Sequence, residues 1–316
     1  MAAFVLHIGH HKTASSLLQR RLFPHLERTA FFLKREIAAS RAIVNAFGAS
    51  PALWREQGDS WLAGLRQEAD RRHPGGVDRL LVSAEGMSAH KLFSRGYLSH
   101  GGGRRDPWRL AGHLREAAAV AARAGLKLQV LLLFRRQDQY LASRFASIGR
   151  HVGALSQANF EAQVQEILDP DRRWCDDGIW LDHALIRDLI CEAIGAEALL
   201  MLPYELLAGD PAAFLQRLTA FLQTPVALDP GTLAVRENAR ALGTGSWKLQ
   251  RGRAGAALEK LLARCPANLL PALPPNRLQL TPDLQQRILA RCSASNRRLA
   301  ADLGLDLAAY GYLPPD

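Results

Sequence analysis

A short polar stretch near the start of the chain has the residue types of an oxyanion-binding loop. Residues 4–8 form a mostly apolar run typical of a buried strand, Gly9 ends it, and a helix is expected to begin at Ser15-Ser16. A helix start presents unpaired backbone N–H groups and a positive dipole end, and Lys12 adds a full charge beside them. The stretch therefore predicts a phosphate-binding loop, with a plain strand-turn-helix carrying an exposed lysine as the alternative.

Two other expected strand ends carry charged residues that suit the same chemistry. Glu85 follows the expected strand 79–83, and Arg135 follows the expected strand 126–134. Ser143 lies on an expected helix after Arg135, at a spacing that lets both side chains reach one phosphate group. Because ligands gather at the carboxyl ends of strands in open parallel sheets, these residues are expected to face the same crevice as the loop.

The elements that must position these residues alternate between strands and helices, which indicates an α/β fold with a central parallel sheet flanked by helices. Strands are expected at 4–8, 79–83, 126–134 and 199–203. Helices are expected at 17–26, shortened or kinked by Pro24, and at 35–47, 60–72, 107–124, 137–148, 160–168, 180–194 and 210–222, with a last helix between Thr281 and Gly304. The polar, basic stretch 229–254 predicts a lid loop over an anionic ligand.

Composition narrows the class of protein. With 316 residues, 48% of them hydrophobic, the chain can bury a large core, and a single domain is the preferred interpretation. Its 4 cysteines show no CxxC or histidine pairing, which argues against a zinc site. The net charge of +10 favours anionic partners, but the arginines are spread along the chain, which argues against nucleic acid. The absence of a signal-peptide pattern and of any run near the roughly 20 apolar residues of a membrane span predicts a cytoplasmic protein.

Together the motifs resemble those of sulfotransferases that use 3′-phosphoadenosine 5′-phosphosulfate (PAPS), most closely the bacterial members. The family's opening His-Ile-Gly-x-His-Lys-Thr-Gly-Thr-Thr is similar to His7-Ile-Gly-His-His-Lys-Thr-Ala-Ser-Ser16. Its Arg-Arg-Gln-Asp-x-x-x-x-Ser is similar to Arg135-Arg-Gln-Asp-Gln-Tyr-Leu-Ala-Ser143. The resemblance implies a P-loop nucleotide-kinase-like three-layer fold in one domain over 1–316, with helical insertions at about 31–75 and 150–195.

The resemblance also implies roles for individual residues. Ala14 stands where the family usually has glycine, and its Cβ strains the loop if the backbone there needs a positive φ. A weaker match between 240–248 and the lid motif of cytosolic members leaves a solvated basic loop as the alternative. The resemblance implies that Lys12, Thr13, Ser15 and Ser16 hold the 5′-phosphosulfate and that Arg135 and Ser143 hold the 3′-phosphate. The implied co-substrate-binding set also includes His10, His11 and Ala14 in the loop and Arg240 and Lys248 in the lid.

Sulfuryl transfer requires in-line positioning and stabilisation of the charge that develops on the leaving phosphate oxygen. Lys12 is expected to supply the positive charge, and Glu85 is expected to act as the base for an acceptor hydroxyl on a carbohydrate or small molecule. His10 and His11 are the alternative bases, and a loop-shaping role is preferred for both. No metal ion is required for this chemistry, and PAP is the expected product.

Two other functions remain open from the sequence. A P-loop kinase for small molecules or nucleotides would need Mg²⁺ and a GxxxxGK[ST] loop, whose spacing this chain does not satisfy. A catalytically degenerate protein that binds a nucleotide or polyanion would need no turnover, and Ala14 keeps that alternative open.

Overall fold

The fold is built on a five-stranded parallel sheet with strand order β2-β3-β1-β4-β5. The structure is a computed structural model, and it describes residues 2–10, 12–88, 93, 107–148, 155–171, 178–226, 228–233, 245–249 and 277–314. The strands are β1 (Ala3–His7), β2 (Thr29–Leu33), β3 (Arg79–Ser83), β4 (Lys127–Phe134) and β5 (Leu199–Pro203). The expected parallel sheet is therefore confirmed.

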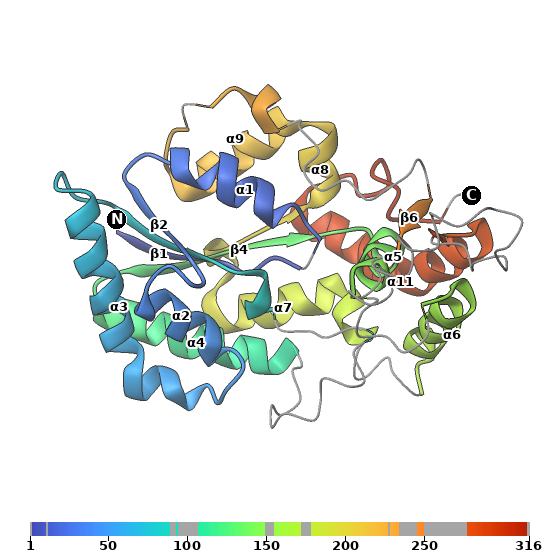
Figure 1. Ribbon diagram of the computed structural model, residues 1–316, viewed down its shortest axis with the longest axis horizontal. Coiled ribbons are helices and arrows are strands. Elements are labelled where there is room, and N and C mark those ends of the chain that lie inside the picture. The colour runs from blue at the N-terminus through green and yellow to red at the C-terminus, as the bar shows by residue number, and fades with distance from the viewer. Residues whose placement is uncertain are drawn as a thin grey trace, which may run out of the picture.

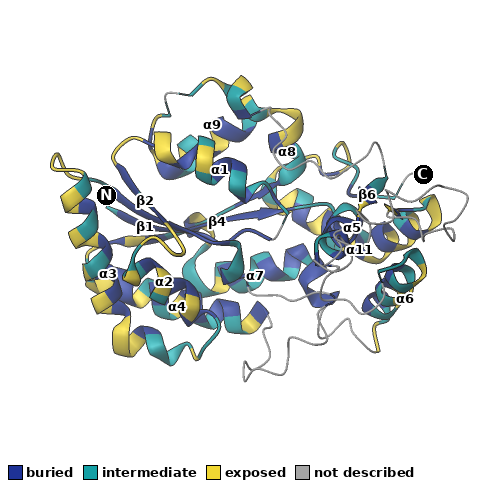
Figure 2. Ribbon diagram, viewed as in Figure 1, coloured by how far each residue is buried: buried dark blue, intermediate teal, exposed yellow. Residues whose placement is uncertain are grey.

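Strand β1 lies at the centre of the sheet, and its register sets what meets at the carboxyl edge. His7 pairs with Ser83 of β3 and with Leu131 of β4, so the chain segments that follow β1 and β3 leave the sheet side by side. All residues of β1 and β3 are buried, as Figure 2 shows for the sheet interior. Burial on both faces is typical of parallel strands and explains their continuous apolar runs.

Helices cover both faces of the sheet, which gives three layers (Figure 1). Phe4 and Leu6 of β1 point into one apolar core, and Val5 points into another on the opposite face. The first face is covered by α2 (Ala38–Ala46), α3 (Ala52–Arg72), α4 (Pro107–Arg123) and α7 (His183–Ile194). The second face is covered by α1 (Ser15–Arg21), α8 (Tyr204–Gly209) and α9 (Pro211–Leu222).

A third apolar cluster lies beyond the carboxyl edge of the sheet, on the right in Figure 1. It is formed by α5 (Gln137–Ile148), α6 (Gln157–Leu168), α11 (Pro282–Leu303) and a small antiparallel pair, β6 (Ser246–Lys248) with β7 (Arg277–Gln279). Because α5 follows β4 directly, this cluster fixes the helix that carries Ser143 against the end of the central sheet.

The structure corrects several sequence-based boundaries. Strand β2, the edge of the sheet, occupies Thr29–Leu33, so the expected helical insertion from about residue 31 begins with strand residues and its first helix starts only at Ala38. The first helix ends at Arg21 instead of residue 26, because Pro24 lies in a separate 3₁₀ turn. Within the expected lid 229–254, residues 246–248 form β6, and most of the rest lies outside the described residues.

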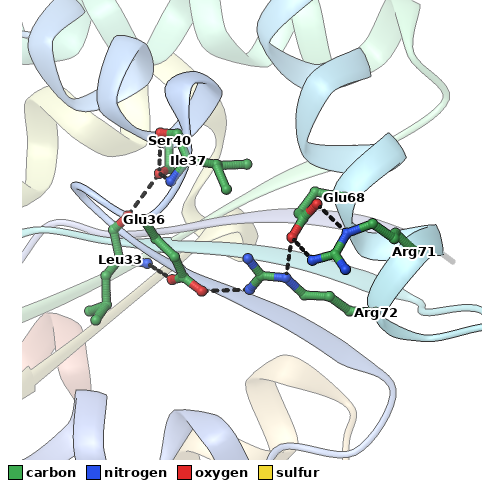
Figure 3. Close-up of polar contacts among 7 residues, drawn as sticks. All are labelled: Leu33, Glu36, Ile37, Ser40, Glu68, Arg71 and Arg72. Carbon is green, nitrogen blue, oxygen red and sulfur yellow. Dashed lines mark hydrogen bonds and ion pairs between the residues drawn. The ribbon is translucent and has the colours of Figure 1, made fainter.

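A cluster of four charged side chains ties the segment after β2 to the end of α3 (Figure 3). It consists of Glu36, Glu68, Arg71 and Arg72 and is called the α3 charge cluster below. Arg72 donates to Glu68 at 2.7 Å and to Glu36 at 2.5 Å, and Arg71 donates to Glu68 at 2.6 Å. The hydrogen bonds from Arg71 and Arg72 lower the pKa of Glu68 to about 2, so every carboxylate in the cluster is matched by a guanidinium.

No helix among the described residues combines the length and the apolar character that crossing a bilayer demands.

Candidate functional site

The loop between β1 and α1 is held in a left-handed backbone conformation at two residues. Lys12 has φ 69°, and Ala14, the N-cap of α1, has φ 61° and ψ 18°. The Thr13 hydroxyl fixes the turn by donating to the carbonyl of His10 at 2.6 Å. The loop thus does require a positive φ where the chain has alanine, at a cost of roughly 1 to 2 kcal/mol relative to glycine's freedom there.

The same loop presents a hydroxyl that the described part of the protein does not satisfy. Ser15 is 1% exposed, and its Oγ has no hydrogen-bond partner among the described residues. A buried polar atom without a partner is costly and is rare in folded proteins. Ser15 therefore has an unused donor at the place where the sequence predicts an oxyanion, with Ser16 half-buried beside it.

The two adjacent arginines after β4 differ sharply in their partners. Arg136 donates to both carboxylate oxygens of fully buried Asp138, at 2.7 and 2.9 Å. Arg135 has no ion pair with any described residue, and its Nε has no hydrogen-bond partner among them. Its Nη1 instead donates to the carbonyl of Lys12 at 3.3 Å, and its guanidinium lies 5.0 Å from the centre of the Tyr204 ring. The Arg135 cation is thereby brought against the β1–α1 loop.

Ser143 lies on α5 and is 9% exposed. No hydrogen bond joins it to Arg135 or to another residue that the structure describes, so its hydroxyl remains available for a ligand. Its neighbour Arg144, which the sequence analysis did not select, has a buried Nε without a hydrogen-bond partner in the described ranges. Arg144 was missed because a lone arginine on a helix has no distinguishing spacing.

Glu85 is placed beside the loop by contacts of the segment around it. Glu85 begins a 3₁₀ turn directly after β3 and is half-buried. The N–H of Ala84 donates to the carbonyl of His7 at 3.1 Å, and the Ser88 hydroxyl lies 3.4 Å from the carbonyl of Gly9 and 3.0 Å from that of Glu85. The carboxylate-bearing turn and the β1–α1 loop are therefore directly connected.

His10 lies at the back of the loop, with no exposed surface. Its ring centre is 5.6 Å from that of Tyr140, 6.3 Å from Trp180 and 5.3 Å from His183. His183 in turn donates from Nε2 to the carbonyl of Arg135 at 3.2 Å, and burial lowers its pKa to about 4. This placement suits a loop-shaping role for His10.

Three further residues belong to the expected co-substrate-binding set, and the structure describes one of them. His11 and Arg240 lie outside the described residues. Lys248 ends β6, opposite Arg277 of β7, and is exposed, whereas its neighbour Trp247 is 2% exposed and packs in the third apolar cluster.

A half-buried acid directly after β5, Glu205, could not be selected from the sequence alone. Glu205 accepts a hydrogen bond from the Tyr312 hydroxyl at 2.7 Å and another from the N–H of Arg136 at 3.2 Å. Burial raises the pKa of Glu205, and the Tyr312 hydrogen bond opposes that rise. The position of Tyr204-Glu205 directly after a buried strand was the available signal, but Tyr312 is far away in the sequence.

The chain is distantly similar to two solved structures. No protein-family model and no curated protein matches the chain. A sulfotransferase from Alicyclobacillus acidocaldarius aligns over 98% of this chain and 98% of its own, with 16% identity and a TM-score of 0.48. The sulfotransferase domain from the curacin biosynthetic pathway aligns over 97% of this chain and 99% of its own, with 13% identity and a TM-score of 0.37. At these low scores neither likeness supports an assignment of function.

Proposed function

We propose that the protein is a sulfotransferase that moves a sulfuryl group from PAPS to an acceptor hydroxyl. The observation that carries the proposal is the state of Arg135, which forms no ion pair with a described carboxylate and donates to the backbone of Lys12. Glu205 interacts electrostatically with Arg135 but forms no ion pair with it, so the Arg135 Nε–H is left without an acceptor among the described residues. A partly buried donor without an acceptor is unfavourable unless a ligand binds it. Two segments that can bind anions, the β1–α1 loop and the residues after β4, thus lie next to each other at the carboxyl edge. A ligand with two separate phosphate groups requires such an arrangement.

The unsatisfied polar atoms of the site suit that ligand. The Ser15 hydroxyl and the Arg135 Nε–H can both donate to phosphate oxygens, and neither has a partner among the described residues. In the proposal, residues 12–16 hold the 5′-phosphosulfate, and Arg135 with Ser143 holds the 3′-phosphate. The motif resemblance of both segments to PAPS-dependent enzymes supports this division. His10, His11, Arg240 and Lys248 complete the proposed set.

The proposed chemistry is a direct transfer. The acceptor oxygen forms a bond to sulfur while the bond between sulfur and the phosphate oxygen breaks, and the acceptor's proton passes to Glu85. Lys12 and the loop stabilise the charge left on the phosphate oxygen. The charge stays on the departing PAP, so no metal ion is needed, and we expect EDTA to leave turnover unchanged.

Thermal stability in the presence of nucleotides tests the binding half of the proposal. A ligand that binds only the folded state raises the melting temperature. We expect 3′,5′-ADP without metal to stabilise the protein and ATP with Mg²⁺ to have a smaller effect. Stabilisation by ATP with Mg²⁺ alone would favour a kinase, and stabilisation by neither would favour a polyanion-binding protein.

Transfer of labelled sulfate from PAPS to a panel of hydroxyl compounds tests the catalytic half. Carbohydrates and small-molecule alcohols form the panel, and the wild type is compared with Glu85→Gln. Binding of 3′,5′-ADP without transfer to any acceptor would favour a catalytically degenerate protein. In that case Ala14→Gly is the first variant to test for restored transfer, because Ala14 has a left-handed backbone.

A further inference from the structure

A buried network of side-chain hydrogen bonds joins three elements of the candidate site. Ser83 is the last residue of β3 and precedes Glu85 by two positions. Its Oγ accepts a hydrogen bond from Nε2 of Gln19, on α1, at 2.9 Å. The same Oγ lies 2.7 Å from Nδ1 of His7, the last residue of β1. His7 is 0% and Ser83 1% exposed, so water does not compete for the hydrogen bond between them, whereas Gln19 is half-buried.

The donors and acceptors give this network a direction. The amide nitrogen of Gln19 can only donate, so Ser83 uses a lone pair to receive it. The one hydroxyl hydrogen of Ser83 then goes to Nδ1 of His7, because no other acceptor for it is present among the described residues. This leaves the imidazole proton of His7 on Nε2.

The far end of the network faces the β1–α1 loop. Nε2 of His7 has no hydrogen-bond partner in the described ranges. It lies 3.2 Å from the point where a Cβ on Gly9 would stand, and the Thr13 Oγ1 lies 3.1 Å from that same point. The side chains of His7 and Thr13 therefore both lie close to Gly9, where a Cβ would stand, and the ring of His7 lies against the loop.

We propose that Gln19, Ser83 and His7 form a positioning relay that fixes the separation between the β1–α1 loop and Glu85. This inference rests on the proposed function, in which the loop holds the leaving phosphate and Glu85 takes the acceptor's proton. Backbone hydrogen bonds already join the Glu85 turn to β1. Strand β3 and α1 share an apolar cluster through Leu81 and Leu18, and within the described residues the Gln19 side chain makes the hydrogen bond between these two elements. The relay thus couples the helix behind Lys12 to the strand behind Glu85.

Steady-state kinetics of matched variants test the relay. Because a misplacement near 1 Å can cost about 100-fold in rate, we expect Ser83→Ala and Gln19→Met to lower kcat by about 10- to 100-fold. The KM for PAPS should stay within about threefold, since neither side chain binds the co-substrate. Ser83→Thr keeps the hydroxyl and should restore most of kcat.

Gln129→Met is the control for Gln19→Met. Gln129 donates to the carbonyl of Phe221 at 3.0 Å, so the substitution removes a comparable hydrogen bond away from the site and should leave kcat unchanged. The double variant Gln19→Met with His7→Phe should lose little more than either single variant, because both act through Ser83. A folded Ser83→Ala or Gln19→Met protein with normal kcat, or with a change in KM alone, would overturn the relay.

A measurement without turnover separates the relay from the proposed function. In ¹⁵N-histidine-labelled wild type near neutral pH, long-range proton–nitrogen correlations should show the Nε2–H form of His7, identified by its loss in His7→Phe. The Nδ1–H form would contradict the relay's direction. A wild type that neither binds 3′,5′-ADP nor transfers sulfate would refute the proposed function. The His7 spectrum would still show whether the hydrogen bonds of the network have the direction given above.

Discussion

Two arginine-rich regions of the molecule balance positive charge in opposite ways. In the α3 charge cluster, Arg71 and Arg72 share Glu68, and Arg72 reaches Glu36 as well (Figure 3). At the carboxyl edge of the sheet, Arg136 is paired with Asp138, but Arg135 forms no ion pair with a described residue and interacts with Glu205 only at longer range. Ion pairs that use every charged group of a cluster can join two elements, whereas a guanidinium without a direct ion pair can still bind an anion. The comparison indicates a structural role for the arginines of the α3 charge cluster and an anion-binding role for Arg135.

Replacing an acid in each region gives the largest expected contrast. Glu85→Gln should lower turnover by about 100- to 10,000-fold, because it removes the proposed base, and should leave 3′,5′-ADP binding intact. Glu36→Gln changes the same chemical group in the α3 charge cluster and should leave turnover unchanged. Sulfate-transfer rates and calorimetric binding measure the two effects. Near-normal turnover in Glu85→Gln would remove Glu85 from the mechanism.

Buried histidines predict how stability depends on pH. Burial lowers the pKa values of His7, His113 and His183 to about 4, below the 6.5 of an exposed histidine. As pH falls from about 7 to 4, the unfolded chain therefore binds protons first, and each histidine removes about 3 kcal/mol from the free energy of unfolding. The raised pKa of Glu205 acts in the opposite direction and offsets part of this loss.

His113 allows this prediction to be tested away from the site. It lies on α4 with its ring 5.0 Å from that of Phe47, outside the carboxyl edge. His113→Leu should reduce the pH dependence of stability by about one proton and leave 3′,5′-ADP binding unchanged. Urea denaturation at about pH 7.5, 6 and 5 measures the slope. An unchanged slope would show that His113 is not held neutral in the folded protein.

The left-handed Ala14 predicts a gain in stability on substitution. Ala14→Gly should raise the free energy of unfolding by about 0.5 to 1 kcal/mol, because relief of the strained φ exceeds the entropy that glycine loses on folding. Ala119→Gly, at an exposed position inside α4, should instead lower it by about 1 kcal/mol. Denaturant midpoints compare the two. A loss of stability in Ala14→Gly would show that the loop does not strain its alanine.

The smallest effect is expected in the α3 charge cluster. Arg72→Met should lower stability by about 0.5 to 1 kcal/mol, since its side chain is 26% exposed and ion pairs near the surface contribute little. It should not change nucleotide affinity. A large drop in 3′,5′-ADP affinity would show that the α3 charge cluster is coupled to the carboxyl edge and is not purely structural.

The sequence predicted the fold where burial leaves a continuous apolar run. Strands β1, β3, β4 and β5 were found within one residue of their observed ends. Strand β2 was missed because it starts at Thr29 and ends at exposed Leu33, so its apolar pattern is weaker than that of β5, the other edge strand, which was found.

The candidate site was predictable to the same degree. Lys12, Glu85 and Arg135 stand at strand ends, and sequence order alone reveals such positions. The side-chain contacts around these residues were not predictable. Tyr312 meets Glu205, and His7 meets Ser83, only because the tertiary fold brings distant parts of the sequence together. Which of two neighbouring arginines lacks a carboxylate is likewise a property of packing and cannot be read from Arg135-Arg136 in the sequence.

Calorimetric titration of 3′,5′-ADP into the wild type and into Arg135→Met tests the central claim most directly. We expect the wild type to bind without metal and Arg135→Met to bind at least about 30-fold more weakly, as the loss of a charged hydrogen-bond donor worth about 2 kcal/mol implies. Arg72→Met, the matched substitution in the α3 charge cluster, should bind as the wild type does. Equal affinity of Arg135→Met and the wild type, or no binding by the wild type, would contradict the account.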